Sequence, residues 1–161
     1  MRSPTPADYD AIRVVVRAAF DSSRFDEATI VEGVRAERRV LVELVAEAEG
    51  AIVGHVLFSR MRVEPPRLIA GLGPVAVAPP HQRQGIGNAL CRAGIEAVRA
   101  MGAEAVVVLG HPEYYPRFGF SHALAAPLTS PFADREAFMG LELTPGALTP
   151  PLKVDYPAAF G

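Results

Sequence analysis

Apolar side chains recur at helical spacing through the first part of the chain. In 5-TPADYDAIRVVVRAAF-20 they fall on one face of a helix, at Ile12, Val15, Val16 and Ala19. Thr5 can cap this helix, and Pro6 suits its first turn. A second helix is predicted over 27–38, with an apolar face formed by Ile30, Val31 and Val34.

The pattern then changes to that of extended chain. The runs 40–48 and 51–63 are typical of two strands, joined by a turn at Glu49 and Gly50. The run 68-LIAGLGPVAV-77 is apolar on both faces, which predicts a central strand. A bulge or an interrupted ladder is expected within it, because it contains Gly71, Gly73 and Pro74.

The clearest helix pattern covers 85–101 and stops at Gly102, and another buried strand is predicted over 104–110. This strand–helix–strand unit should form a right-handed parallel crossover. Three further segments are expected to be a short helix or turn and two strands: 112–120, 136–143 and 152–156. No repeat or linker interrupts the pattern, so a single α/β domain is expected over 1–161.

Composition narrows the class of protein. Half of the 161 residues are hydrophobic and the net charge is −2, which is typical of a globular domain and argues against nucleic acid as a partner. No apolar run approaches the roughly 20 residues of a membrane helix, so no membrane partner is expected. The single cysteine, Cys91, favours a cytoplasmic protein and is expected to be a buried apolar side chain. The four histidines lie far apart, so no metal site is expected.

The stretch 79-PPHQRQGIGNALCRAG-94 places flexible residues where the 85–101 helix begins. The first N–H groups of a helix have no intrahelical partner and can hold a phosphate. Gly85 and Gly87 would let a diphosphate approach, while Arg83 adds a cation and Gln82 an amide donor. A tight structural turn explains the same glycines, so their spacing alone leaves both interpretations open.

The wider stretch 75-VAVAPPHQRQGIGNAL-90 resembles the central motif of the GNAT family, the Gcn5-related N-acetyltransferases. That motif is a strand ending in Val, then Pro, then Gln/Arg-x-x-Gly-x-Gly/Ala, here Val77, Pro79, Gln82, Gly85 and Gly87. The segment 113-EYYPRFGF-120 is similar to a second family segment, and the order of elements agrees from about 5 to 157. The stretches 53–59 and 114–120 resemble the YhbS-like bacterial subgroup.

This resemblance implies an acyl-CoA N-acyltransferase fold of the α/β (α+β) class. Its mixed central sheet splays between the fourth and fifth strands, and helices cover both faces. Acetyl-CoA, the cosubstrate, would lie in that gap. The residues implied to bind it are Val75, Ala76, Val77, Gln82, Arg83, Gln84, Gly85, Ile86, Gly87 and Asn88. The short first strand of the family would fall in MRSPTPAD, which is poor in β-forming residues.

The resemblance also implies an N-acetyltransferase that acetylates a primary amine of a small molecule or peptide by direct aminolysis. Tyr115 stands four residues before Gly119, as the family's tyrosine does, and is the candidate acid for the departing thiolate. A packed aromatic side chain is the alternative for Tyr115. Tyr114 is expected in the core or in a pocket wall.

Other roles are left open by the sequence. No acid lies within 67–79, so the general base is Glu64, His55 or water, although a structural role suits His55 better. His111 is either pocket lining or loop. The resemblance implies that the acceptor is selected by segments that here are 21–30 and 121–140. A homodimer is possible, and the alternative function is a non-catalytic acyl-CoA-binding sensor or partner module.

Overall fold

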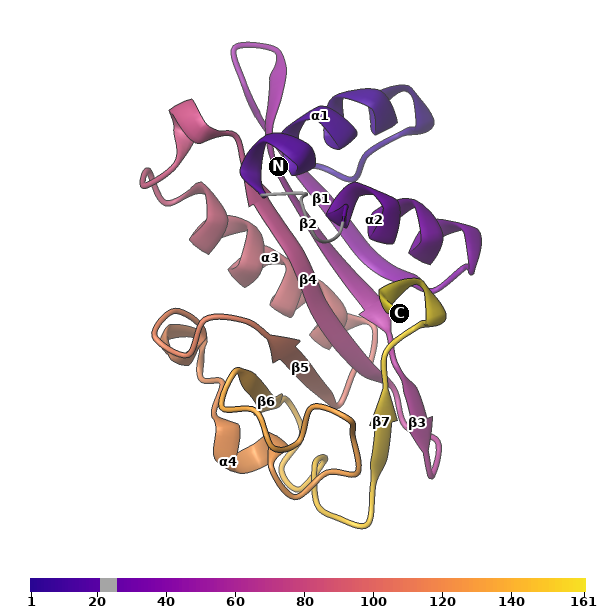
Figure 1. The fold of residues 1–161 in the computed structure, drawn as a ribbon. Coiled ribbons are helices and arrows are strands. Elements are labelled where there is room, and N and C mark those ends of the chain that lie inside the picture. The colour runs from indigo at the N-terminus through magenta and orange to yellow at the C-terminus, as the bar shows by residue number, and fades with distance from the viewer. Residues whose placement is uncertain (21–25) are drawn as a thin grey trace.

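The computed structural model describes residues 1–20 and 26–161 (Figure 1). The helices are α1 (Tyr9–Ala19), α2 (Glu27–Ala36), α3 (Ile86–Ala100) and α4 (His122–Ala125). The strands are β1 (Val40–Ala48), β2 (Ala51–Arg60), β3 (Arg62–Glu64), β4 (Ile69–Val77), β5 (Ala105–Leu109), β6 (Phe138–Glu142) and β7 (Lys153–Asp155). Single 3₁₀ turns cover Pro6–Asp8, Pro79–His81, Tyr115–Phe118 and Ala158–Phe160. The main elements therefore follow the predicted order, with α4 as an unpredicted addition.

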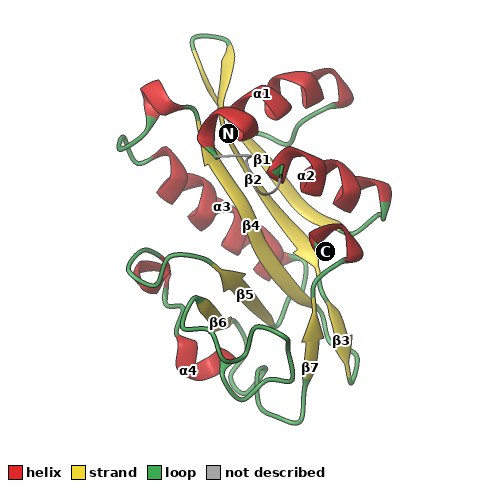
Figure 2. Ribbon diagram, in the orientation of Figure 1, coloured by secondary structure: helices red, strands yellow, loops and turns green. Residues whose placement is uncertain are grey.

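The main sheet has the strand order β1-β2-β4-β5-β6 and is mixed (Figure 2). Its neighbours pair antiparallel except for β4 and β5, which pair in parallel as the crossover rule requires. The family's first strand is reduced to one bridge, in which Arg2 N–H donates to the Val45 carbonyl at 3.1 Å. The β-poor composition of the first eight residues accounts for this loss.

The expected strand over 51–63 is wrong at its end, because the chain leaves the main sheet at Met61. The Met61 side chain is buried, and a β-carbon at Gly71 would lie 2.6 Å from its sulfur. Beyond it, β3 pairs with β7 in a separate two-stranded sheet. The apolar pattern continues through this bend, so periodicity alone could not locate it.

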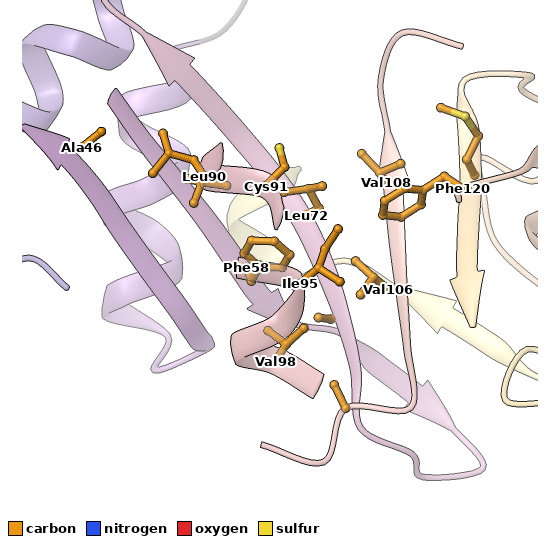
Figure 3. Packing of buried hydrophobic residues seen from close by; sticks show 14 of the residues in the cluster. Ala46, Phe58, Leu72, Leu90, Cys91, Ile95, Val98, Val106, Val108 and Phe120 are labelled. Atoms are coloured by element: carbon orange, nitrogen blue, oxygen red, sulfur yellow. The ribbon is translucent and has the colours of Figure 1, made fainter. Parts of the chain in front are cut away.

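Helices cover both faces of the main sheet, because alternate side chains of each strand point to opposite faces. On one face, Phe58 of β2 packs with Leu90, Cys91 and Ile95 of α3 (Figure 3). On the other face, Leu57 packs with the buried side chains of α2, and α1 contributes a third cluster: Ile12, Val15 and Val16.

The strands β4 and β5 diverge, as the resemblance implied (Figure 1). Their parallel pairing covers only Ile69–Leu72 against 105–108. Val75 and Leu72 of β4 pair with Val56 and Phe58 of β2, so β4 carries one extra residue and forms the expected bulge. The segment 73–77 consequently keeps β2 on one edge, and no strand of the described chain pairs with its other edge.

Candidate active site

A cavity of about 800 Å³ opens where β4 and β5 diverge. Its walls come from the free edge of β4, the start of α3, the end of β5 and the 3₁₀ turn that contains Tyr115. The end of α1, the start of α2 and the C-terminal segment close its other side. One space thus joins the segments expected to hold acetyl-CoA with those expected to hold an acceptor.

The glycine loop begins α3 with a left-handed residue. Gly85 is the N-cap with φ +83°, and Arg83 has φ +63°. The first main-chain bond at this end runs from Ala89 N–H to the Gly85 carbonyl at 3.0 Å. Within the described residues, the N–H groups of Arg83, Gln84 and Gly85 donate to no protein acceptor. This row of free donors at a helix N-terminus suits an anion.

The predicted cofactor-binding residues differ in their relation to the cavity, and Arg83, Gln84, Gly85 and Asn88 are not among the residues that line it. Val75, Val77, Gln82 and Gly87 line the cavity. The Ala76 side chain is buried on the opposite face with the α1 cluster, and Ile86 packs against the α3 core, so only their main chains can serve a ligand in the cavity.

Three amide side chains at the loop and the start of α3 bind protein atoms, and the longest of these bonds runs from the Gln84 amide to the Pro80 carbonyl at 3.5 Å. The Gln82 amide donates to the Val77 carbonyl at 2.9 Å and fixes the loop to the end of β4. Asn88 Oδ1 accepts the Tyr114 hydroxyl at 2.6 Å. The bonds of Gln82 and Asn88 therefore stabilise the shape of the cavity. The Gln82 amide is consequently not the free donor that the sequence indicated.

Tyr114 forms a wall of the cavity, in agreement with the expectation for it. Its ring lies under the Arg117 guanidinium at 4.2 Å. Burial raises the pKa of the Tyr114 phenol to about 12. The hydroxyl is consequently protonated at neutral pH and remains a donor to Asn88.

Tyr115 also lines the cavity, and its ring packs edge-on against Tyr114 and Phe120 at 5.0 and 6.0 Å between centroids. Among the residues that the structure describes, none forms a hydrogen bond with its side chain. Burial, with smaller effects from Cys91 and Tyr114, raises the pKa of the Tyr115 phenol above its usual range. Tyr115 therefore presents a protonated hydroxyl that no described residue engages.

Cys91 is fully buried in the α3 core, as predicted. Burial raises the pKa of its thiol to about 12, so the thiolate is scarce at neutral pH. Cys91 accordingly acts as a core side chain.

The two protein candidates for the general base lie away from the cavity. Glu64 is on β3 and lines a separate hollow of about 630 Å³. His55 is fully buried, with Nε2 2.8 Å from Glu43 Oε1, and Glu43 also binds Arg35. His111 does line the cavity. Neither Glu64 nor His55 lines this cavity, so water is the remaining candidate among the bases expected from the sequence.

The side of the cavity formed by the segments expected to hold an acceptor includes side chains that the sequence did not mark. Of the segment 21–30, residues 21–25 lie outside the described residues, whereas Glu27 and Ile30 line the cavity. The segment 121–140 contributes Phe132 and Arg135, and its other apolar residues are mostly core. Glu27 is an acid at the start of the helix predicted within 21–30, and this position is the sequence signal that could have identified it. Nothing local marked the C-terminal members, Tyr156 and Phe160.

Within residues 1–20 and 26–161, no helix is long and apolar enough to cross a membrane, and no group of three or more His, Cys, Asp and Glu side chains could hold a metal ion.

Residues 10–120 match the family model described as "Acetyltransferase (GNAT) family". The uncharacterized N-acetyltransferase YjhQ of Escherichia coli (strain K12) is 37% identical over 154 residues, with 89% of this chain and 83% of the relative covered. A GNAT family acetyltransferase from Brucella melitensis, crystallised with acetyl-CoA, is 36% identical with a TM-score of 0.83, covering 99% and 96% of the two chains. YhbS from Escherichia coli, crystallised with CoA, is 31% identical with a TM-score of 0.86, covering 99% and 89%.

Proposed function

The chain belongs to the GNAT family of acetyltransferases, and on that basis we propose that it transfers the acetyl group of acetyl-CoA to a primary amine of a small molecule or peptide. One observation carries the proposal: the unpaired edge of β4 and the free N–H groups of the glycine loop open into the cavity that Tyr115 lines. The proposed catalytic unit is the whole domain, 1–161.

The residues present fit acetyl-CoA. The free edge of 73–77 offers main-chain groups to an extended pantetheine arm, as an edge strand does to an added strand. The N–H groups around Gly85 suit the diphosphate. A β-carbon at Gly87 would meet nothing closer than the Tyr114 hydroxyl at 3.4 Å. Protein packing therefore does not require a glycine at position 87. The absence of a side chain there leaves space that a ligand can occupy.

The proposed reaction is direct aminolysis of the thioester. The neutral acceptor nitrogen attacks the acetyl carbonyl carbon, so a C–N bond forms and the C–S bond breaks. The electron pair of the C–S bond stays with sulfur, which takes a proton from the Tyr115 hydroxyl. The nitrogen loses one proton, and water carries a proton back to the Tyr115 phenolate. The products are the N-acetylated amine and the CoA thiol.

The contribution of the chain is mainly positional. Holding the two reactants in one cavity replaces a bimolecular encounter. A main-chain N–H beside the β4 bulge, from Gly73 or Val75, can polarise the acetyl carbonyl, because Pro74 between them has no N–H. Tyr115 supplies the proton, since its raised pKa keeps the hydroxyl protonated.

The test is thiol release from acetyl-CoA in the presence of a panel of primary amines, with mass spectrometry of the products. We expect acetylated amine in step with free thiol, and little of either with the Tyr115→Phe variant. Tight CoA binding without turnover on any amine would contradict the proposal and leave a non-catalytic acyl-CoA-binding module.

A further inference from the structure

Two unsatisfied polar atoms belong to the acceptor side of the cavity. Across residues 1–20 and 26–161, four buried side-chain atoms have no hydrogen-bond partner: Glu27 Oε2, His55 Nδ1, Ser59 Oγ and Tyr156 Oη. Glu27 and Tyr156 both line the cavity, whereas His55 and Ser59 do not. Burying a polar group without a partner is costly, so such atoms call for a physical explanation.

The surroundings of Glu27 explain why its oxygen is not satisfied by protein. Glu27 is the first residue of α2, and the N-cap Asp26 already accepts the Ala28 N–H at 3.1 Å. The nearby cation Arg17 pairs with Asp26 at 2.7 Å. Arg35, at the other end of α2, is bound to Glu43. Arg17 and Arg35 are therefore engaged with other acids, and Arg135, which lines the same cavity, lies over the Phe132 ring at 5.3 Å.

The Tyr156 backbone and ring are held by several contacts, whereas its hydroxyl has no hydrogen-bond partner in the described chain. Two nitrogens of the Arg62 guanidinium, Nε and Nη2, donate to the Tyr156 carbonyl at 3.0 and 2.6 Å. The ring packs against Phe132 and Phe160, with centroids 5.7 and 4.9 Å away. Burial raises the pKa of the Tyr156 phenol, so the hydroxyl remains protonated and can both donate and accept. The fixed ring thus presents an unused hydrogen-bonding group.

We propose that Glu27 and Tyr156 bind the acceptor: Glu27 Oε2 pairs with its ammonium group, and Tyr156 Oη forms a second hydrogen bond with it. This inference rests on the proposed function, because it assigns the substrate class of the same cavity. An ammonium group offers three donors, which matches two unsatisfied acceptors better than a carboxylate or phosphate would. The roles are binding and positioning, with proton removal left to water.

The other lining residues near Glu27 and Tyr156 restrict which chemical groups the acceptor can carry besides its amine. Glu27 is the one acid among the described lining residues, while Arg135 adds a cation and Phe20, Ile30, Phe132 and Phe160 add apolar surface. A polyamine or a lysine-rich peptide would bring additional cations without further acids to receive them. The acceptor is therefore a small primary monoamine with an apolar or aromatic body.

The test measures amine binding without chemistry. CoA-loaded protein, which carries no acetyl group to transfer, is titrated with 2-phenylethylamine by calorimetry. We expect Glu27→Gln to weaken this binding about tenfold to a hundredfold, because a charge-assisted bond is lost. Tyr156→Phe should weaken it several-fold. Glu32→Gln is the matched control: Glu32 is on the same helix but pairs with Arg13 outside the cavity, so binding should not change.

Each result decides a distinct point. Unchanged 2-phenylethylamine affinity in Glu27→Gln would overturn the role of Glu27. Failure of the wild-type protein to bind 2-phenylethylamine, or tighter binding of spermidine, would overturn the acceptor class. Affinity for CoA itself should be equal in all variants. Absence of any acetyl transfer by wild type, with amine binding intact, would instead contradict the proposed function and leave the binding inference standing.

Discussion

The ring of Tyr115 occupies the space that a side chain at Gly110 would need. A β-carbon at position 110 would lie 2.3 Å from Tyr115 Cε2, closer than any real β-carbon contact. Gly110 directly follows β5 and is held there by its N–H, which donates to the Ala137 carbonyl at 3.0 Å. The direction of the proposed acid thus depends on the absence of a side chain five residues earlier.

We predict that Gly110→Ala displaces the Tyr115 ring and lowers kcat about tenfold or more, because a small displacement of a catalytic group strongly reduces the reaction rate. Affinity for CoA should change little, because the glycine loop is untouched. Steady-state kinetics with a double-mutant cycle checks this. In a Tyr115→Phe background the alanine should cost little further activity; additive losses would argue that Gly110 acts independently of the tyrosine.

Tyr115→Phe should lower kcat by about a hundredfold, the usual size of a general-acid contribution, while CoA affinity stays near that of wild type. The raised pKa of Tyr115 also fixes the pH dependence. An acid works while it is protonated, so activity should not fall on the alkaline side until pH exceeds about 10, the ordinary phenol value. A tyrosine-dependent decline near pH 8 in a kcat profile would contradict this assignment.

Gly85→Asp should abolish CoA binding without unfolding the protein, because its carboxylate would oppose the diphosphate. Gly102→Asp is the matched control at the other end of α3. Both glycines have positive φ, +83° and +92°, and a β-carbon at either would meet nothing within 4 Å. The helix dipole favours the acid at position 85 over position 102. Calorimetry and thermal melts should show Gly85→Asp no less stable than the control, yet unable to bind CoA.

Gly94→Ala should destabilise the fold by about 1–3 kcal/mol through overpacking. A β-carbon there would lie 2.0 Å from Phe58 Cε2, within the α3 core. Urea unfolding measures the loss. Phe58→Leu removes the opposing ring edge, so the double variant should be more stable than the sum of the single changes predicts. Strict additivity would mean that helix propensity or another contact governs position 94.

Acid should weaken the fold through Glu43. Burial raises the pKa of this carboxyl, but hydrogen bonds from His55 and Arg35 outweigh that effect and bring it below its usual value. A lowered pKa stabilises the fold above the unfolded value of about 4.3 and loses that contribution as pH falls through the folded value. Glu43→Gln should therefore flatten the fall in unfolding free energy below pH 5. Exposed Glu32→Gln should leave the slope unchanged.

Local sequence patterns predicted much of the part of the cavity that is proposed to bind acetyl-CoA. Gly85 and Gly87 mark the start of α3, and the run to Val77 marks the strand before it, because backbone conformation and burial leave local traces. The break at Met61 left no such trace, since its apolar side chain fits a continuing strand equally well. Gln82 was recognised, but its bond to Val77 depends on how the loop folds back on β4.

The sequence by itself determined the order of the main elements and, through the family resemblance, marked the glycine loop and Tyr115 as candidates, because each of these patterns lies within a few neighbouring residues. Only the tertiary structure decided that Glu27 and Tyr156, near opposite ends of the chain, line one cavity with Tyr115. It also moved Glu64 and His55 away from that cavity. The physical reason is that long-range packing, here the divergence of β4 from β5, sets which distant side chains share a space.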